Sequence, residues 1–520
     1  MTIIAGALRA DRKDLIWAAK RVAYVAFKTT TGFLLRHSFL FAVLAAAVIM
    51  RLLMLRAYPY AFFFPDSRPY VAGAFDNVPY DIRPFGYSVL LKPFVPGPLQ
   101  HVAVAQHVLG LCLILAGYAF LVHRRVQPWL AALAMVPIAL DARELTLEHY
   151  VLAETAYLAL TALALIVLAW RDRIGVVAAA IAGLLLGFAA ITRTVGLPVI
   201  GLVVLYLLVR RIGWARLAVF LLPVVLILGG YLVWYHMTYK VYAFGQFQGR
   251  FLYGRVMPIA DCRRLELTPL QRTLCMPNAP RRWKQRPDQY IWNPSSPINS
   301  LYPSTVNDEF IGGFAKEVIK QHPRAYLKMV LTETGWHLMP QAPLWHYNQC
   351  PQERWLLPAM PGESCNAAYY LDTFSPLSAP AATIKVPNPQ GEQLRRYGMT
   401  MTTPGPVYAA GVLFALLAAV FRPRRVSWRG AADSLLFVGA GLGLIVVSVA
   451  TSMFDYRYSN PAVLLIPMGI ALAVTRIVAA ARLKKERPPN TEDTEDTVPT
   501  PALIARIPVQ TTKAAAEHVK

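Results

Sequence analysis

One phrase near the start of the chain places a carboxylate and an arginine among aromatic and proline residues. It occupies residues 64–70, reads FPDSRPY, and follows the first apolar stretch. Asp66 should therefore lie at a lipid–water boundary, where partial desolvation raises the pKa of a carboxyl group and suits it to act as a general base toward a hydroxyl. A loop cap, or a salt bridge to Arg68 or Arg83, is the structural alternative.

A second group of candidate residues begins near residue 140 and contains mostly acids. Its members are Asp141, Glu144, Glu148, His149 and Glu154. Carboxylates within membrane segments are costly and usually functional. Glu154 begins an otherwise apolar run and is the one we expect at a site, with a helix-to-helix hydrogen bond as its alternative. Asp141 and Glu144 also fit simple surface charges.

Two arginines lie beside apolar runs, at positions where the chain is expected to leave the membrane. Arg193 closes one run, and Arg457 lies in the phrase DYRY at 455–458. A guanidinium group holds phosphate through paired hydrogen bonds, so both are candidates for binding a phosphate. Tyr456, in the same phrase as Arg457, is a further candidate for substrate binding. Snorkelling of the arginines to lipid headgroups is the alternative.

Composition identifies the scaffold that must position these residues. The chain has 520 residues, of which 56% are hydrophobic and 16% charged, with a mean hydropathy of +0.40. Soluble domains carry about 25% charged residues, and apolar runs long enough to cross a bilayer recur here. We predict an all-α polytopic bundle of about ten spans, near 38–57, 99–122, 127–141, 150–170, 174–192, 195–209, 216–235, 405–421, 431–452 and 459–480.

Basic residues set the predicted orientation of the bundle. The net charge is +23 and the pI about 9.9, but the basic residues cluster at every second junction between spans, so nucleic-acid binding is not expected. By the positive-inside rule both termini are cytoplasmic and the candidate site faces outward. We expect a multi-pass protein of a bacterial plasma membrane.

The predicted organisation has five parts. Residues 1–37 form a basic cytoplasmic leader, expected to be an amphipathic interfacial helix, with a disordered arm as the alternative. Residues 38–235 form a transmembrane module with outer loops at 58–98 and 142–149. Residues 236–404 form an extracytoplasmic domain, helical at 310–319 and 325–338 and otherwise rich in loops. Residues 405–480 return to the membrane, and 481–520 form a disordered cytoplasmic tail.

Four of the five cysteines fall in the predicted outer domain. Cys262, Cys275, Cys350 and Cys365 lie there, while Cys112 lies in a span. An oxidising compartment favours two disulfides, and pairing of sequence neighbours is the simplest of three connectivities. A structural zinc site is the alternative, although the tight paired spacing of such sites is missing.

Other patterns carry less chemical information. The pairs Gly183/Gly187 and Gly439/Gly443 have the small-xxx-small spacing of closely packed membrane helices. The outer domain is rich in aromatics that could stack on sugars or form its core: Trp283, Tyr290, Trp292, Trp336, Trp345, Tyr347 and Trp355. No P-loop or dinucleotide fingerprint is present, so a soluble nucleotide is not the expected donor.

Taken in order, four phrases resemble motifs of the polytopic GT-C glycosyltransferases. This superfamily includes protein O-mannosyltransferases, lipid A aminoarabinose transferases and actinobacterial arabinofuranosyltransferases. PDS at 65–67 resembles its early acidic motif, RPFGY at 83–87 its Arg-Pro-Pro-Gly-Tyr phrase, and LAET at 152–155 its Ser-Glu-Thr phrase. GLLLG at 183–187 leading to Thr192-Arg193, together with YRY at 456–458, matches recurrent features.

The resemblance implies a polyprenyl-phosphate sugar as donor and an inverting transfer to a glycan, lipid or protein. Asp66 would act as general base, Arg193 and Arg457 would stabilise the leaving phosphate, and Arg83 and Glu154 would position the substrates. Ser67 stands where many members carry a second acid, so a divalent cation is a less secure part of the implied mechanism. No other cofactor is expected.

Two other functions remain open from the sequence. An envelope polysaccharide polymerase or ligase is also polytopic with a large outer loop, but it uses a diphosphate donor and relies on Arg and His. A transporter or flippase would be expected to show inverted repeats and broken helices, which the sequence does not display convincingly.

Overall fold

The computed structural model describes residues 12–281, 283, 286–304, 307–341, 355, 357, 369–370, 382–383, 389–420 and 428–485. Side chains at 12–30, 369–370, 382–383, 389 and 483–485 are not described. Cys350, Cys365, Trp345, Tyr347 and the tail beyond 485 lie outside the described residues, so the predictions about them stay predictions.

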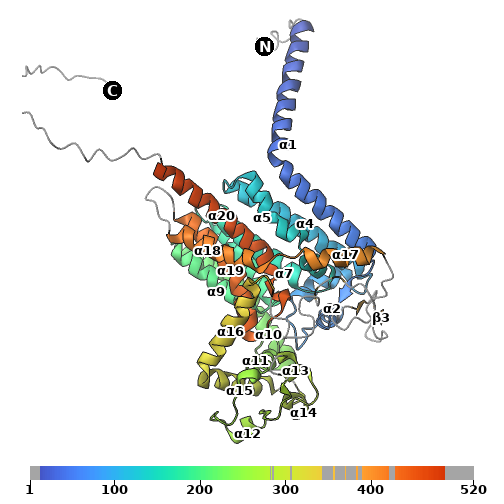
Figure 1. Ribbon diagram of the computed structural model, residues 1–520, viewed down its shortest axis with the longest axis vertical. Helices are drawn as coiled ribbons and strands as arrows, with labels where there is room; N and C mark the ends of the chain where they lie inside the picture. The colour runs from blue at the N-terminus through green and yellow to red at the C-terminus, as the bar shows by residue number, and fades with distance from the viewer. Residues whose placement is uncertain are drawn as a thin grey trace, which may run out of the picture.

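Apolar helices pack side by side into a bundle (Figure 1), and each predicted span coincides with one of them. They are α1 (Arg12–Ala57), α4 (Gln100–His123), α5 (Pro128–Leu140), α7 (Glu154–Ala169), α8 (Val176–Thr192), α9 (Gly196–Val209), α10 (Trp214–Tyr239), α18 (Gly405–Val420), α19 (Arg429–Thr451) and α20 (Asn460–Lys485). The prediction of a helical membrane bundle is therefore confirmed.

Not all of these helices are long enough to cross a bilayer alone. Five described stretches pass on length and hydropathy, Thr31–Ala57, Gln100–His123, Trp214–Tyr239, Arg429–Thr451 and Tyr456–Arg482. A sixth span results if α18 is joined to α17 (Pro389–Thr400), to which it is bent by 40°. The others are shorter: α7 has 16 residues and is about 24 Å long, below the roughly 30 Å of a hydrocarbon core.

The bundle has one large apolar core, formed by side chains of α4, α5, α7, α8, α19 and α20. Gly183 and Gly187 lie directly against α10, as their spacing predicts, because a Cβ on Gly183 would lie 2.0 Å from the Phe220 carbonyl oxygen. The second glycine pair is different. A Cβ on Gly443 would have no atom within 4 Å, and it is Gly441 that lies against Ile466 of α20.

The leader is helical but is not a separate element. Helix α1 begins at Arg12 and runs unbroken to Ala57, so no boundary occurs near residue 37. Figure 1 shows the first half of α1 extending beyond the other helices. Its interfacial placement remains a prediction.

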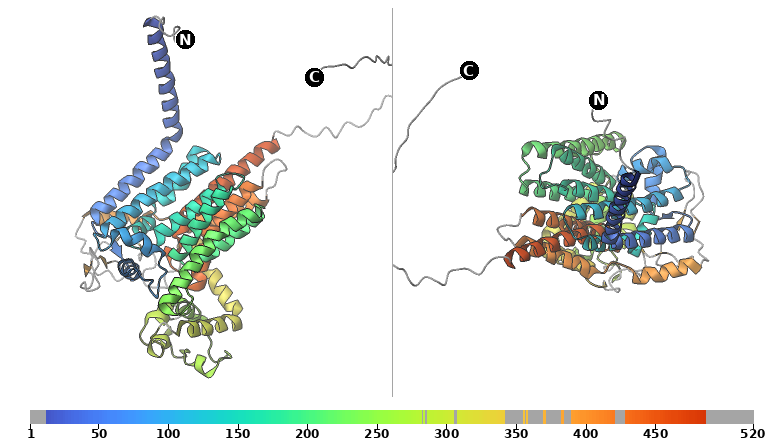
Figure 2. Two further views of the ribbon diagram at one scale, coloured as in Figure 1. Left: turned by 180° about the vertical axis from the view of Figure 1, so that it is seen from behind. Right: turned by 90° about the horizontal axis from the view of Figure 1, so that it is seen from above.

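A second group of helices lies beyond one end of the bundle (Figures 1 and 2). It comprises α11 (Gln248–Val256), η3 (Met257–Ile259), α12 (Pro269–Arg272), α13 (Pro287–Trp292), α14 (Pro297–Ser300), α15 (Asp308–Gln321) and α16 (Pro323–Leu338). These helices share a small core around Tyr253 and Phe314, and a disulfide joins Cys262 to Cys275 as predicted. The predicted helices at 310–319 and 325–338 are confirmed as α15 and α16.

The segment predicted as the first outer loop, residues 58–98, is built from short elements packed on the same end of the bundle. These are β1 (Phe62–Phe63), α2 (Ser67–Asp76), α3 (Gly86–Leu91) and η2 (Lys92–Phe94), with α6 (Ala142–His149) beside them. Strand β1 pairs antiparallel with β2 (Tyr369–Tyr370), which pairs with β3 (Ala382–Thr383), in the registers Phe62↔Tyr370 and Tyr369↔Thr383. A small sheet thus joins the loop to a segment more than 300 residues away.

Candidate active site

Backbone pairing brings the two most prominent carboxylates to the same place. Asp66 is the residue before α2, and the Ser67 hydroxyl fixes this turn by accepting a hydrogen bond from the Phe64 amide at 2.9 Å. Four residues earlier, the Phe62 carbonyl accepts a hydrogen bond from the Val151 amide at 2.8 Å. Since Val151 lies three residues before Glu154, the segments carrying the two acids are held side by side.

The RPFGY phrase is held against the end of α8 by a glycine. A Cβ on Gly86 would lie 2.6 Å from the backbone of Ile191 and Thr192, so only glycine permits this approach. Arg83, three residues before it, and Arg193, one residue after Thr192, thereby line the same cavity. A short turn at residues 193–195 joins α8 to α9.

The third arginine comes from the turn between α19 and α20. Arg457 lies in η7 (Tyr456–Ser459), which is capped by Asp455, whose side chain accepts from the Arg457 amide at 2.9 Å. The Arg457 guanidinium is stacked near the rings of Trp355 and Phe64, 5.2 and 5.4 Å from their centres. These contacts fix its direction toward Asp66 and Glu154.

The five residues form one continuous alternating chain of charges. Arg83 lies 2.6 Å from Asp66 Oδ1, and Arg457 Nη2 lies 3.0 Å from Asp66 Oδ2. Arg457 Nε and Arg193 Nη1 each lie 2.8 Å from Glu154 Oε1. Three guanidinium groups therefore face two carboxylates, and the chain carries a net charge of +1.

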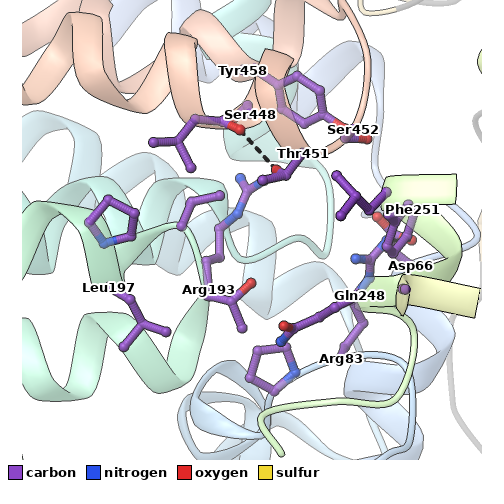
Figure 3. Close-up of a pocket in the computed structure, with 18 of the residues that line it drawn as sticks. Asp66, Arg83, Arg193, Leu197, Gln248, Phe251, Ser448, Thr451, Ser452 and Tyr458 are labelled. Carbon is purple, nitrogen blue, oxygen red and sulfur yellow. Dashed lines mark hydrogen bonds and ion pairs between the residues drawn. The ribbon is translucent and has the colours of Figure 1, made fainter. Parts of the chain in front are cut away.

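This chain of charges lines a cavity of about 580 Å³. Figure 3 shows Asp66 and Arg83 on one side, Arg193 and Leu197 on the other, and Ser448, Thr451 and Tyr458 along a third wall. The lining combines membrane helices α9 and α19 with α11 and α15 of the outer group. Beside Arg193 the wall becomes apolar, with Val195, Leu197, Pro198 and Val447. The cavity therefore suits a ligand with an anionic head and an apolar continuation.

The protonation state of Asp66 differs from the one that the sequence suggested. Burial raises the pKa of this carboxyl, but the guanidinium groups of Arg83 and Arg457 outweigh burial and hold its pKa well below the usual range. The expectation of a raised pKa is wrong, because the sequence does not reveal that two arginines converge on one carboxylate. Asp66 is ionised at any physiological pH.

The second-loop acids lie outside this cavity, in structural roles. Asp141 caps α6 by accepting from the amides of Arg143 and Glu144, at 2.8 and 3.2 Å. Glu144 accepts from the Asn460 side chain, and Glu148 pairs with Arg51 at 2.6 Å. None of the three lines the cavity that contains Asp66, and all are buried rather than surface charges.

Tyr456 also points away from the cavity, and Tyr458 lines it instead. The Tyr456 ring lies under the Arg143 guanidinium at 3.9 Å and packs on Phe454. Residues 456 and 458 are separated by most of a 3₁₀ turn, so only one of the two tyrosines can face the cavity.

Several residues that line the cavity were not among the candidates chosen from the sequence. Tyr70, Gln248, Phe251, Lys316 and Thr451 line the cavity, and among them only Tyr70 belongs to one of the motifs described above. Most of the aromatics considered for sugar stacking are core residues, since Trp283, Tyr290, Trp336 and Trp355 are buried. The aromatic rings at the cavity belong to Tyr70, Phe251 and Tyr458.

Among the described residues, no group of three or more His, Cys, Asp or Glu side chains lies close enough together to hold a metal ion. Both oxygens of Asp66 instead accept hydrogen bonds from arginine. The need for a divalent cation therefore stays untested, and the charge at this site is supplied by guanidinium groups.

Comparison with known proteins adds one structural similarity. No protein-family model and no curated protein matches the chain. The crystal structure of ArnT from Cupriavidus metallidurans bound to undecaprenyl phosphate matches with 14% sequence identity, covering 86% of this chain and 80% of that chain, at a TM-score of 0.32. The chain is therefore similar to that ArnT structure over most of its length.

At a TM-score of 0.32 the two backbones superpose only loosely. The match therefore says nothing about which residues act here or which molecules bind, and both questions depend on the cavity itself.

A first prediction concerns the glycine that brings Arg83 toward Arg193. Gly86→Ala should destabilise the protein by about 1–3 kcal/mol, because the added methyl group meets backbone atoms that cannot move away cheaply. Gly229→Ala in α10 is the matched control, since nothing lies within 4 Å of its Cβ position. Thermal unfolding in detergent would compare them, and equal midpoints would contradict the close approach.

A second prediction concerns acid stability and His337 on α16. Burial and the nearby Arg143 lower the pKa of His337 to about 3, whereas the pKa of a histidine in the unfolded chain is about 6.5. The folded state thus binds fewer protons between these values, so this stabilisation is complete above about pH 6.5 and is lost as the pH falls toward about 3.

His337→Phe should therefore reduce the fall in unfolding midpoint between about pH 7.5 and about pH 4.5. The ring packs on Phe454, with centres 4.4 Å apart, and neither ring nitrogen has a hydrogen-bond partner among the described residues, so phenylalanine is tolerated. His101→Phe, at an exposed position of α4, is the control. An acid sensitivity equal to that of the wild type would show that His337 does not contribute.

Proposed function

We propose that the chain is a membrane glycosyltransferase that moves a sugar from a polyprenyl-phosphate donor to an acceptor hydroxyl on the extracytoplasmic face. The observation that carries this proposal is the alternating chain from Arg83 through Asp66, Arg457 and Glu154 to Arg193, beside an apolar wall of α9 and α19. It offers paired donors for a phosphate, a carboxylate for a proton and a hydrophobic exit for a lipid.

The charge of the site favours a phosphodiester over a diphosphate. A sugar joined to a polyprenyl phosphate carries one negative charge, which the net +1 of the five-residue chain neutralises. A diphosphate donor would bring a second negative charge, which this five-residue chain does not balance. The other charged side chains that line the cavity are Lys316, Asp308 and Glu309, so they add no excess of cations. This favours the transferase over the polymerase or ligase.

In the proposed reaction an acceptor hydroxyl attacks the anomeric carbon of the donor. A new carbon–oxygen bond forms, the bond from the anomeric carbon to the phosphate oxygen breaks, and the hydroxyl proton passes to Asp66. The products are the glycosylated acceptor, with inverted configuration, and polyprenyl phosphate. Arg193 and Arg457 stabilise the charge that grows on the leaving phosphate.

Asp66 is a weak base while it is hydrogen-bonded to two arginines, so it should become an effective base only after the donor has bound. A donor phosphate competes for the same guanidinium donors. When Arg83 or Arg457 donates some of its hydrogen bonds to the phosphate instead of to Asp66, the pKa of Asp66 rises and Asp66 becomes a stronger base. Donor binding and base activation are thereby coupled, which limits wasteful hydrolysis of the donor by water.

Glu154 has a different role in this scheme. Its side chain is 3% exposed and holds Arg193 and Arg457 together through one oxygen. It keeps the two guanidinium groups close, so that both can reach one phosphate. We assign it to positioning rather than to proton transfer.

The test compares the envelope glycans of a deletion strain complemented with wild-type protein or with Asp66→Asn, at equal membrane levels. Restoration of a missing sugar by the wild type alone supports the transferase and identifies the substrate. Full restoration by Asp66→Asn would refute the general base and favour a transporter or flippase.

A further inference from the structure

A buried line of polar side chains lies behind the first outer loop, outside the proposed catalytic cavity. Arg51 of α1 lies 2.6 Å from Glu148 Oε1, and Glu148 Oε2 lies 2.7 Å from His107 Nδ1. His107 Nε2 then lies 3.0 Å from His149 Nδ1, and His149 Nε2 lies 2.9 Å from the Tyr60 carbonyl oxygen. All four side chains are buried.

Counting donors along this line determines where its protons are. The Tyr60 carbonyl can only accept, so His149 Nε2 must carry a proton and donate it. The carboxylate of the line, Glu148, contacts His107 and not His149, so a positive charge is better placed on His107 than on His149. Burial and the neighbouring His107 also lower the pKa of His149 to about 3. The His149 ring is therefore neutral and its Nδ1 accepts. His107 Nε2 must therefore donate to His149.

The remaining contact, between His107 Nδ1 and Glu148, requires one more proton. Either Glu148 is protonated and donates to a neutral His107, or Glu148 is ionised and His107 carries protons on both nitrogens. Arg51 favours the second arrangement because it donates to Glu148 at 2.6 Å and stabilises the carboxylate. Its guanidinium is fixed by the Ala139 carbonyl as well, at 3.0 Å.

The packing around the line leaves room for the Glu148 carboxyl group. Gly110 of α4 leaves the necessary space, since a Cβ there would lie 1.9 Å from Glu148 Oε1. Among the described residues, charged or titratable groups also lie near the line on each neighbouring element. They include Asp141 before α6, Glu144 of α6, Glu154 of α7, Glu392, Arg395 and Tyr397 of α17, Tyr87 of α3, and Tyr58 and Tyr60 after α1. Burial and the charges of Glu148 and Asp141 raise the pKa of Glu144 well above its usual range, so Glu144 is not the counter-ion.

The far end of the line is the segment that carries Asp66. Tyr60 lies two residues before Phe62, whose carbonyl accepts the hydrogen bond from Val151. His149 precedes Val151 by two residues, so it ties the same two segments together a second time. Asp66 follows directly, at the start of α2.

We propose that His107 is a buried imidazolium, and that its proton allows His149 to donate to the Tyr60 carbonyl and act as a positioning residue for Asp66. If His107 lost this proton, one of the three hydrogen bonds from Glu148 to Tyr60 would have no donor, and the segment 60–66 would lose an anchor. The consequence for catalysis rests on the proposed function, whereas the protonation state does not.

Nitrogen NMR tests the proton directly. Full-length protein labelled with ¹⁵N-histidine, in detergent at neutral pH, should show His107 with both ring nitrogens protonated and His149 neutral with its proton on Nε2. Loss of signals in His107→Gln assigns the first ring, and His101→Gln on the same helix is the control. Glu148→Gln should convert His107 to the neutral form. A neutral His107 in the wild type would overturn the proposal.

A pair of variants tests the positioning role. His149→Phe removes the donor but keeps the ring volume, whereas His149→Gln places an amide donor near the position of Nε2. We expect His149→Phe to lower kcat for sugar transfer on the order of 10²-fold through misplacement of Asp66, with KM little changed and His149→Gln close to the wild type. Equal loss in both variants, or loss in neither, would overturn the role.

Hydrogen exchange makes the same comparison without any substrate. Exchange within peptide 58–66 should be faster in His149→Phe than in the wild type and near normal in His149→Gln. The two proposals can fail separately. If no variant and no wild-type preparation transfers sugar, but His107 is protonated and the exchange rates differ as expected, the proposed function is refuted and the positioning role stands. Identical exchange in all three proteins would refute the role.

Discussion

Asp66→Asn is expected to abolish sugar transfer while leaving the donor bound. The substitution keeps the size of the side chain and one hydrogen-bond acceptor but removes the group that takes the proton, which costs on the order of 10²–10⁴ in rate for a general base. It also leaves Arg83 and Arg457 without their shared carboxylate, so the site gains positive charge and should bind a polyprenyl phosphate at least as tightly.

Two assays on the purified protein would separate these effects. Binding of polyprenyl phosphate in detergent reports on the arginines, and release of polyprenyl phosphate from a sugar donor in the presence of acceptor reports on transfer. Asp76→Asn, at an exposed position of the same helix α2, is the matched control and should behave as the wild type. Loss of binding and transfer together would mean that Asp66 organises the site rather than acting as its base.

Arg457→Ala is expected to have the second largest effect, and the opposite pattern. Arg457 is the only residue among the five that contacts both carboxylates, and its removal lowers the net charge of this five-residue chain from +1 to zero. A charge-assisted hydrogen bond contributes about 1.5–3 kcal/mol, so phosphate binding should weaken by roughly 10- to 100-fold. Transfer should fall further, because the leaving phosphate loses a stabilising charge.

Arg457→Lys distinguishes charge from geometry. Lysine retains the positive charge but cannot bridge two carboxylates as a planar guanidinium does, so we expect binding between that of the wild type and that of Arg457→Ala. Arg264→Ala, which removes an exposed ion pair with Asp261 at 3.3 Å, is the control and should change neither measurement. Binding unchanged in Arg457→Ala would exclude this residue from the phosphate site.

The charged residues of the proposed site could be recognised from their positions relative to the apolar runs of the sequence. Asp66, Glu154, Arg193 and Arg457 each flank or begin an apolar run, and charges in such positions are rare enough to indicate function. The same reasoning also selected Asp141, Glu144 and Glu148, which lie outside the cavity that contains Asp66. These acids have the right type and position, but they cap α6 or pair with Arg51 and Asn460.

The ion-pair and hydrogen-bond partners of these side chains could not be predicted from the sequence in the same way. Arg51 and His107 lie in apolar helices and belong to no motif, yet they complete the buried line that ends at Tyr60. The low pKa of Asp66 has the same origin, because it depends on Arg457, which is 391 residues away. Which of two neighbouring tyrosines faces the cavity was likewise decided by the rotation of a single 3₁₀ turn.

The sequence by itself determined that the chain is a helical membrane protein, where its helices lie, and which charges interrupt them. These properties follow from hydrophobicity and from the spacing of residues that are close together in the sequence. The tertiary structure alone decided that three arginines and two carboxylates form one chain around a cavity. That arrangement depends on contacts between distant segments, such as Gly86 against α8 and Phe62 against Val151. The free energies of such contacts cannot be predicted from a local sequence pattern.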